Sequence, residues 1–456
     1  MVGATRSCSC AMNREELIAL DRPDVRPQLL ARWHEARSIT DALFSSLSPE
    51  VLYQRPIAER HRIVFYLGHL EAFDWNLLTT RRTVSASVNA GFSQLFAFGI
   101  DPVGTGLPQD VPSDWPDLRD IHAYRDAVRE ALDELVGTLP VSWSGPWAGG
   151  GGRHFDAACL LNVAIEHRLM HAETLAYMLH RLPVGSLREE EAPLGAQTAP
   201  ARAALPTSMV SIPSGSVTLG ESRSKAQAFG WDNEFPAHEV AVPAFAIDQH
   251  MVTNGQYLAF MADGGYERAE CWKPQDWAWR ESQGIRQPAF WRCERDGWWL
   301  RTMHQELPLP LDWPVYVSHA EASAYARWAG KALPTEAQWM RAALGAQPLQ
   351  VGQCNADFRR WDPEPVQACQ QASGFGVVGM YGNGWEWTRS AFEPAEGFEA
   401  FPFYPGYSKD FFDGQHFVLK GGSPRTAACM LRPSFRNWFQ AHYQHVYAGL
   451  RCVSAD

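Results

Sequence analysis

Residues 165–179, IEHRLMHAETLAYML, form an apolar stretch that places two histidines, His167 and His171, four positions apart. Residues four apart on a helix project from the same face, so two imidazoles spaced in this way can hold one divalent ion if another helix supplies a third ligand. His69, in VFYLGHLEAFDW (64–75), is the candidate for that ligand. Three neutral imidazole nitrogens with open coordination positions suit an iron or zinc ion that must also admit a substrate. The stretch therefore predicts a metal site built between helices.

Around this stretch, residues 13–183 have the pattern of a helical bundle. Apolar residues recur at helical spacing, and turn residues such as Gly137 and Pro140 interrupt them. The predicted helices cover 26–47, 61–79, 121–139 and 156–181. Four helices of this length make an up-down bundle, whose sites are built in the core from facing side chains. The first residues, 1–12, are predicted to be a disordered tail.

The sequence changes character after the bundle. Residues 184–206 are rich in Gly, Pro and Ala, which is the composition of a linker. Residues 207–456 contain short alternating runs separated by turn residues, together with a helix predicted to begin at Ser318, where Glu321 completes a capping box. The chain has 19 tryptophans, many of them after residue 230, which suits a loop-rich domain packed by aromatic side chains. We therefore expect an α+β protein of two domains.

Composition excludes several classes of protein. A chain of 456 residues is too long for one core, and 46% hydrophobic with 20% charged residues is typical of a soluble globular protein. The net charge of −11, without a basic stripe, argues against nucleic-acid binding. Because the chain has neither a signal-peptide core nor a run of about eighteen apolar residues, we expect a cytoplasmic protein without a membrane segment. The nine cysteines lack metal-binding or redox spacing and are expected to be reduced and mostly buried.

Several motifs resemble those of a known family. The C-terminal part resembles the formylglycine-generating-enzyme-like domain, a variant of the C-type-lectin fold, in DNEFPAHEVAVPAFAIDQHMVTNGQYLAFMADGGY (232–266), GNGWEWT (382–388), LKGGS (419–423) and RPSFRNW (432–438). The N-terminal part resembles a DinB-like bundle that carries a histidine followed by HxxxHxE. In this order the two parts are similar to the iron-dependent ergothioneine synthases, which join sulfur to the imidazole of hercynine (trimethylated histidine). A sister branch, the selenoneine synthases, has the same architecture and installs selenium.

The resemblance implies roles for individual residues of the bundle and of the loop FYPGYSKDFF. His69, His167 and His171 match the family's three iron ligands, so Fe(II) is the expected cofactor and O2 a substrate. Tyr404 matches the tyrosine that serves as a proton donor near the iron, a task for which a neutral phenol is suited because it brings no charge into a buried site. Glu173, the last residue of HxxxHxE, is a candidate acceptor for the N–H of a ligand imidazole.

The resemblance also implies contacts with hercynine in the segment RPSFRNWF. Asn437 is expected to hydrogen-bond the carboxylate of hercynine, while Trp438 and Phe439 offer aromatic faces to its trimethylammonium group by cation–π attraction. Tyr407 and Tyr443 are further candidates for contacts with a substrate. The site is therefore expected to be completed by the C-terminal domain.

The continuation of this segment, RNWFQAHYQHVYAGLRC (436–452), departs from the family members that use γ-glutamylcysteine. Phe439 takes the position of an acidic residue, and Tyr443 and Gln444 take those of paired arginines that hold the two carboxylates of the donor. The bundle loop GFSQLFAFGIDP (91–102) contains no arginine either. A neutral polyhydroxylated donor fits better, so we predict formation of a carbon–selenium bond between a selenosugar and the imidazole C2 of hercynine.

Three alternatives stay open. An ergothioneine-type synthase would instead form a carbon–sulfur bond between hercynine and cysteine or another thiol, since some members that accept cysteine also lack the paired arginines. In a non-catalytic module, the histidine triad would hold structural zinc and the C-terminal domain would bind a ligand. A formylglycine-generating oxidase that acts on sulfatases would need a pair of cysteines for copper, and the sequence shows no such pair where that family has it.

Overall fold

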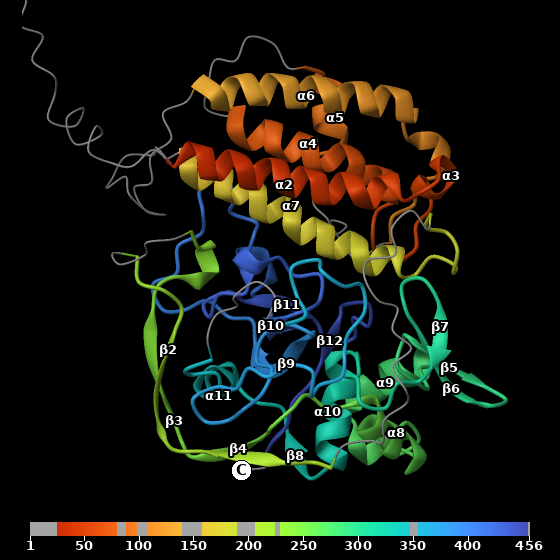
Figure 1. Cartoon of the computed structure of the whole chain (residues 1–456), viewed down its shortest axis with the longest axis vertical. Coiled ribbons are helices and arrows are strands. Elements are labelled where there is room, and N and C mark those ends of the chain that lie inside the picture. Colours follow the sequence, from red (N-terminus) through yellow and green to blue (C-terminus); the bar gives the residue numbers. More distant parts are fainter. Residues whose placement is uncertain are drawn as a thin grey trace, which may run out of the picture.

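The computed structural model describes residues 25–79, 88–97, 107–138, 157–188, 206–223, 229–346 and 354–454. The expected disordered tail, most of the expected linker and residues 98–102 of the bundle loop lie outside these ranges. Figure 1 shows a layer of helices stacked on a second domain of short strands, helices and long loops. This arrangement confirms the expected α+β fold of two domains.

Four long helices form the N-terminal domain, and their bounds lie within a few residues of the predicted ones. They are α2 (Arg26–Ser45), α4 (Ile63–Thr79), α6 (Leu118–Thr138) and α7 (Ala157–Leu179). Three short elements, which the sequence pattern did not indicate, accompany them: α3 (Pro49–Leu52), α5 (Ala90–Leu95) and the 3-10 turn η1 (Pro112–Asp114). Helix α2 packs on α7, and α4 packs on both α6 and α7.

The burial of each helix follows from its sequence and decides where the metal site can lie. Helix α6 is amphipathic and buries one stripe, namely Ile121, Tyr124, Val128, Leu132 and Val136. Helix α7 is buried almost all round, because the bundle covers one side of it and the C-terminal domain covers the other (Figure 1). A helix that is apolar on every face belongs in an interior. The two histidines of α7 therefore lie between the domains.

In the described ranges, the C-terminal domain is built from short strands in four sheets. The strands are β1 (Met209–Ile212), β2 (Gly215–Leu219), β3 (His238–Val242), β4 (Phe245–Asp248), β5 (Trp291–Glu294), β6 (Gly297–Arg301), β7 (Glu306–Pro308), β8 (Lys331–Ala332), β9 (Gly384–Ala391), β10 (His416–Gly422), β11 (Asn437–Gln440), β12 (Ala448–Gly449) and β13 (Val453–Ser454). The strand orders are β1-β4-β13-β8, β11-β10-β9-β12, β2-β3 and β5-β6-β7. In the sheet β11-β10-β9-β12, all pairs are antiparallel except β12 with β9.

Helices and 3-10 turns connect these strands. They are η2 (Asp232–Glu234), α8 (Asn254–Ala262), η3 (Ala269–Cys271), α9 (Pro274–Ser282), α10 (His319–Trp328), α11 (Glu336–Ala342), η4 (Lys409–Phe411) and η5 (Ala428–Met430). The predicted capping box is present at α10, where the Ser318 hydroxyl accepts from the amide of Glu321 and the Glu321 carboxylate accepts from the amide of Ser318. The seven cysteines in the described ranges form no disulfide with one another and five of them are buried, as expected. Among the described helices, none has the length and apolar content that a bilayer crossing requires.

Candidate metal centre

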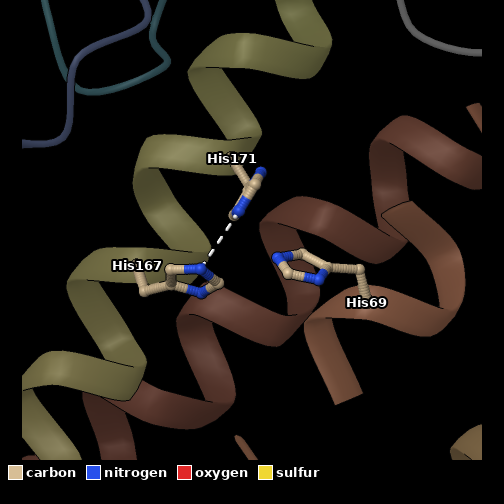
Figure 2. A group of neighbouring side chains, drawn as sticks. All are labelled: His69, His167 and His171. Atoms are coloured by element: carbon tan, nitrogen blue, oxygen red, sulfur yellow. Dashed lines mark hydrogen bonds between the residues drawn. The ribbon is translucent and has the colours of Figure 1, made fainter. Parts of the chain in front are cut away.

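The three predicted ligands meet between α4 and α7 (Figure 2). Helix α4 supplies His69, and α7 supplies His167 and His171. Their exposed fractions are 4%, 2% and 1%, and their ligand nitrogens all lie within 4.8 Å of one another. The Nε2 atoms of His167 and His171 are 3.1 Å apart, as the spacing of four residues predicts for two side chains on one helical face.

The hydrogen-bond partners of the histidine ring nitrogens indicate whether a metal ion fits the site. The Nδ1 atom of His69 lies 2.8 Å from the carbonyl oxygen of Phe96, which fixes the ring and directs Nε2 toward the other two histidines. Within the described ranges, the Nε2 atom of His69 and the Nδ1 atoms of His167 and His171 have no hydrogen-bond partner. Buried polar atoms normally have partners. Three buried imidazoles whose ligand nitrogens converge, with an unpartnered Nε2 atom on His69, therefore fit a divalent ion such as iron or zinc.

Burial keeps the three imidazoles neutral. It lowers the pKa of His69 to about 4, with a further lowering from the charge of His61 and Arg168. Burial, and then the charge of neighbouring groups, lowers the pKa values of His167 and His171 well below the usual value of 6.5. Because a metal binds the neutral imidazole, these shifts leave the triad in its ligating form at neutral pH.

Aromatic side chains hold the ligand rings in place. Phe73 stacks on His167 with a centroid distance of 3.4 Å and an interplanar angle of 11°. Phe65 stacks on His69 at 4.8 Å. Both phenylalanines lie on α4, four residues to either side of the His69 position, so one helix supplies a ligand and the packing for two ligand rings. Such packing restricts the rotamers of the imidazoles.

A buried ion-pair network, which the sequence analysis missed, ties the two ligand helices together. Arg168, next to His167 on α7 and 1% exposed, bonds the carboxylates of Glu71 at 3.0 Å and Asp74 at 2.7 Å on α4. Arg129 of α6 also bonds Glu71, at 2.7 Å. The signal in the sequence was the presence of these charges within otherwise apolar helices, because a buried charge requires a partner.

Two tyrosines of the C-terminal domain lie beside the triad, in the loop 401–408. The Tyr404 ring is 6.3 Å from the ring of His167 and 5.3 Å from that of Phe73, measured between centroids. Tyr407 is buried, and its hydroxyl donates to the sulfur of Met170, which directly precedes His171. Burial raises the pKa of Tyr407 well above 10, so its phenol is neutral.

The segment predicted to contact hercynine divides between two aromatic clusters. Trp438 stacks on Phe392 at 4.1 Å and meets Tyr407 edge-on at 5.3 Å. Phe439 stacks face to face on Tyr443 at 5.1 Å. Successive residues of a strand point to opposite faces, so Trp438 adjoins the tyrosines near the triad and Phe439 belongs to a different surface of β11.

The side chain of Asn437 is engaged within its own strand. Its Oδ1 atom accepts a hydrogen bond from the backbone amide of Trp438 at 2.9 Å. The side-chain amide nitrogen of Asn437 is a donor, which is the kind of group that a carboxylate binds. Its predicted contact with hercynine stays a prediction.

One arginine, Arg60, lies near a site in which no arginine was expected. It precedes α4, is 7% exposed, and donates from Nε to the hydroxyl of Tyr443 at 3.0 Å. Its charge is one of the causes of the lowered pKa of His171, so it lies near the triad. The arginines of the relatives were expected in 91–102 and 436–452, whereas this guanidinium comes from a third segment. Tyr443, which takes the position of one of the two expected arginines, is therefore stacked on Phe439 and bonded to one cation.

Glu173 does not have the role that its position in HxxxHxE suggested. Its carboxylate accepts hydrogen bonds from the indole of Trp385 at 2.8 Å, the hydroxyl of Ser423 at 2.5 Å and the hydroxyl of Thr426 at 2.9 Å. All three donors belong to the C-terminal domain. Glu173 therefore joins the domains and is no acceptor for a ligand imidazole.

A second carboxylate on α7 makes a similar connection. Glu166, next to His167, accepts from the indole of Trp231 at 2.8 Å and from the guanidinium of Arg432 at 2.8 Å. Glu166 and Glu173 are two helical turns apart and so lie on one face, on either side of the histidine pair. The C-terminal domain thus binds α7 at both ends of the stretch that carries the ligands.

Comparisons with known proteins agree with this architecture. Residues 32–175 match the DinB superfamily, and residues 196–456 match the sulfatase-modifying factor enzyme 1-like domain. The hercynine oxygenase of Mycolicibacterium smegmatis is 34% identical over 353 residues, which are 73% of this chain and 77% of the relative. The hercynine oxygenase of Mycolicibacterium thermoresistibile is 37% identical over 63% of this chain and 67% of its own length.

A fungal relative extends over nearly the whole chain. Ergothioneine biosynthesis protein 1 of Neurospora crassa is 26% identical over 92% of this chain and 57% of its own length. The match to this one relative therefore includes both domains, with the segments that carry the triad and the tyrosine loop. The chain belongs to the family of the hercynine oxygenases and ergothioneine biosynthesis proteins.

Proposed function

We propose that this protein is an oxygen-dependent non-haem iron enzyme that attaches a chalcogen atom to the imidazole C2 of hercynine. The observation that carries the proposal is the buried triad of His69, His167 and His171, whose ligand nitrogens lie within 4.8 Å of one another and whose His69 Nε2 atom has no hydrogen-bond partner in the described ranges. The similarity to hercynine oxygenases supports hercynine and O2 as substrates. Among the described residues the site has three protein donors, all of them histidines, which leaves coordination positions open for substrates.

The residues around the triad have separable tasks in this proposal. Fe(II) held by the triad would supply the activation of O2 and the coordination positions for the substrates. The ring of Tyr404 lies next to that of His167, which supports a role for its phenol as the proton donor of the reaction. Trp438 presents an indole beside the tyrosine loop, which suits a trimethylammonium group. Tyr407, buried and neutral, fills the space between these groups and keeps water out.

The relatives favour sulfur as the chalcogen. Hercynine oxygenases and an ergothioneine biosynthesis protein support the alternative of a thiol donor better than the predicted selenosugar. The stack of Phe439 on Tyr443 supports the selenosugar as a second candidate, because aromatic faces suit a sugar ring. In addition, Tyr443 and Gln444 replace the paired arginines that would hold a donor with two carboxylates. Arg60, bonded to Tyr443, offers one guanidinium to an anionic group of a donor such as cysteine.

One set of incubations tests the proposal and the choice of donor. The iron(II)-loaded protein is given hercynine and O2 with cysteine, γ-glutamylcysteine, a thiosugar or a selenosugar in separate reactions, and the adducts are identified by mass spectrometry. We expect an adduct at imidazole C2 from cysteine or from a chalcogen sugar. An adduct from γ-glutamylcysteine alone would contradict the argument from Phe439 and Tyr443.

Substitution of a ligand separates an enzyme from a metal-stabilised binding module. His171→Ala should abolish iron binding and turnover together, whereas His34→Ala, a change of an exposed histidine on α2, should leave both unchanged. Metal content by emission spectroscopy and O2 uptake with hercynine are the measurements. A protein that retains zinc, binds hercynine and consumes no O2 in the iron form would be the non-catalytic module.

A further inference from the structure

A short segment, Trp231–Glu234, contacts both halves of the candidate site. It contains the 3-10 turn η2 and is buried throughout, with exposed fractions of 0%, 0%, 4% and 1% along its four residues. All four of these residues carry polar side-chain groups that burial penalises, so their partners indicate what the segment holds. None of them is a candidate ligand or substrate contact in the proposed reaction.

The carboxylate of Asp232 joins the two ends of the tyrosine loop. One oxygen accepts from the hydroxyl of Ser408 at 2.5 Å, and the other accepts from the backbone amide of Phe401 at 3.2 Å. Asn233 adds a bond from its side-chain amide to the Ser408 hydroxyl at 2.9 Å. Tyr404 lies midway between these two anchors, so a single side chain fixes both points from which its loop departs.

Backbone hydrogen bonds within the loop connect these anchored ends to Tyr404. The amide of Tyr404 donates to the carbonyl of Phe401 at 3.0 Å, and the amide of Tyr407 donates to the carbonyl of Tyr404 at 3.2 Å. Phe401 is fully buried and stacks on Phe403 at 4.9 Å. The Phe401 residue that Asp232 holds is therefore also the residue from which the turn at Tyr404 begins.

The same segment is bonded to the ligand helix. Trp231 donates from its indole nitrogen to Glu166, which directly precedes His167, and its ring stacks on Tyr407 at 3.8 Å. The segment thus lies between the helix that carries His167 and the loop that carries Tyr404. The segment therefore connects the position of this helix to the position of the loop.

We propose that Asp232 is a positioning residue, which sets the place of the Tyr404 phenol relative to His167 by holding both ends of the loop 401–408. This inference rests on the proposed function, because the position matters to the reaction only if Tyr404 donates a proton in it. Misplacement of a reacting group by about 1 Å can cost about 100-fold in rate, so a loop anchor can control turnover without touching a substrate.

A purely stabilising role fits Asp232 less well. Burial raises its pKa to about 6, so the ionised carboxylate present at neutral pH is held at a cost to folding. An asparagine could accept from the Phe401 amide and donate to the Ser408 hydroxyl without carrying a charge. Asp232→Asn is therefore the conservative variant that should keep the anchor, and Asp232→Ala is the variant that removes it.

A double-mutant cycle with Tyr404 tests the inference. In the iron-loaded protein, Asp232→Ala should lower kcat about 10- to 100-fold, with iron content unchanged and the KM for hercynine changed less than about 3-fold. In the Tyr404→Phe background the same change should lower kcat by less than about 2-fold, because the group that it positions is gone. Asp232→Asn should stay within about 5-fold of the native protein. Losses that multiply in the double variant would overturn the inference.

Hydrogen exchange followed by mass spectrometry gives a readout that is independent of turnover. Asp232→Ala should raise exchange in residues 401–408 and leave β11 unchanged, whereas unchanged exchange in the loop would overturn the inference. A protein without activity on hercynine but with this exchange pattern would refute the proposed function and leave the loop anchor intact. Ser408→Ala, which removes one of the two bonds, should act in the same direction if Asp232→Ala does not fold.

Asp248→Ala is the matched control. Asp248 is 5% exposed and accepts from the ammonium of Lys331 at 2.6 Å and the amide of Cys452 at 2.9 Å. It lies at the end of β4, on the far side of the C-terminal domain from α7 (Figure 1). Its loss should lower the free energy of unfolding but leave kcat and exchange in 401–408 as in the native protein.

Discussion

Removal of the Glu173 carboxylate should weaken the contact between the domains and, with it, the metal site. Glu173→Ala leaves three buried donors of the C-terminal domain without their acceptor, namely the indole of Trp385 and the hydroxyls of Ser423 and Thr426. The indole N–H cannot turn to another partner, so it bears the full cost of an unsatisfied buried donor, about 2–3 kcal/mol. The two hydroxyls, which lie 3.3 Å apart, can bond each other and should cost about 1 kcal/mol each.

The expected loss in the free energy of unfolding is therefore about 4–5 kcal/mol. Glu173→Gln should behave differently, because the indole of Trp385 and the hydroxyl of Ser423 both donate to Oε1, an oxygen that glutamine retains. The Thr426 hydroxyl can accept from the new amide nitrogen. Burial raises the pKa of Glu173, so loss of its charge carries no penalty of its own, and we expect a change below about 1 kcal/mol.

Urea titration followed by tryptophan fluorescence measures these differences, and metal content after dialysis against Fe(II) measures the effect on the triad. Glu134→Ala, on the exposed face of α6, is the matched control and should change the free energy of unfolding by less than about 0.5 kcal/mol. We expect the alanine variant of Glu173 to bind less iron as well, since His171 is two residues away. Equal losses in Glu173→Ala and Glu173→Gln would refute the reasoning, because charge and not hydrogen bonding would then be the cause.

Three further measurements test other parts of the structure. Arg168→Leu leaves Glu71 and Asp74 buried without their shared cation and should lower the free energy of unfolding by about 3–5 kcal/mol; a loss below about 1 kcal/mol would contradict this. Burial lowers the pKa of His180 to about 3, so its stability contribution is complete above pH 6.5 and is lost as the pH falls toward 3. Between pH 6.5 and 5 the native protein should lose about 2 kcal/mol more than His180→Gln, and equal slopes would argue against a neutral buried imidazole. Chelation should lower the melting temperature of the native protein and leave that of His171→Ala unchanged.

The sequence predicted those features whose signals are local. Helical periodicity located the four long helices, and the spacing of four residues placed His167 and His171 on one face. It could not predict the partner of Glu173, because the donors lie more than 200 positions away and no local rule selects among the many polar side chains of the C-terminal domain. Arg60 was missed for the same reason: its contact with Tyr443 joins segments separated by 383 positions.

The charged residues within α7 nevertheless indicate contacts with other elements, which helical periodicity does not show. A helix that is apolar on nearly every face has no solvent for Glu166, Arg168 or Glu173, so each of them must meet a partner in another element. Arg168 meets α4, whereas the two glutamates meet the C-terminal domain. Such a pattern predicts which side chains of the helix bond to another element, although not their partners.

The same distribution explains how one helix can serve both the metal and the domain contact. The face of α7 that carries His167 and His171 points toward α4, and the face that carries Glu166 and Glu173 points toward the C-terminal domain. A rotation of α7 that moved the imidazoles would break bonds to both neighbours at once. The position of the ligands relative to Tyr404 therefore also depends on contacts at a different face of the helix, and substitutions there should alter the metal site without touching it.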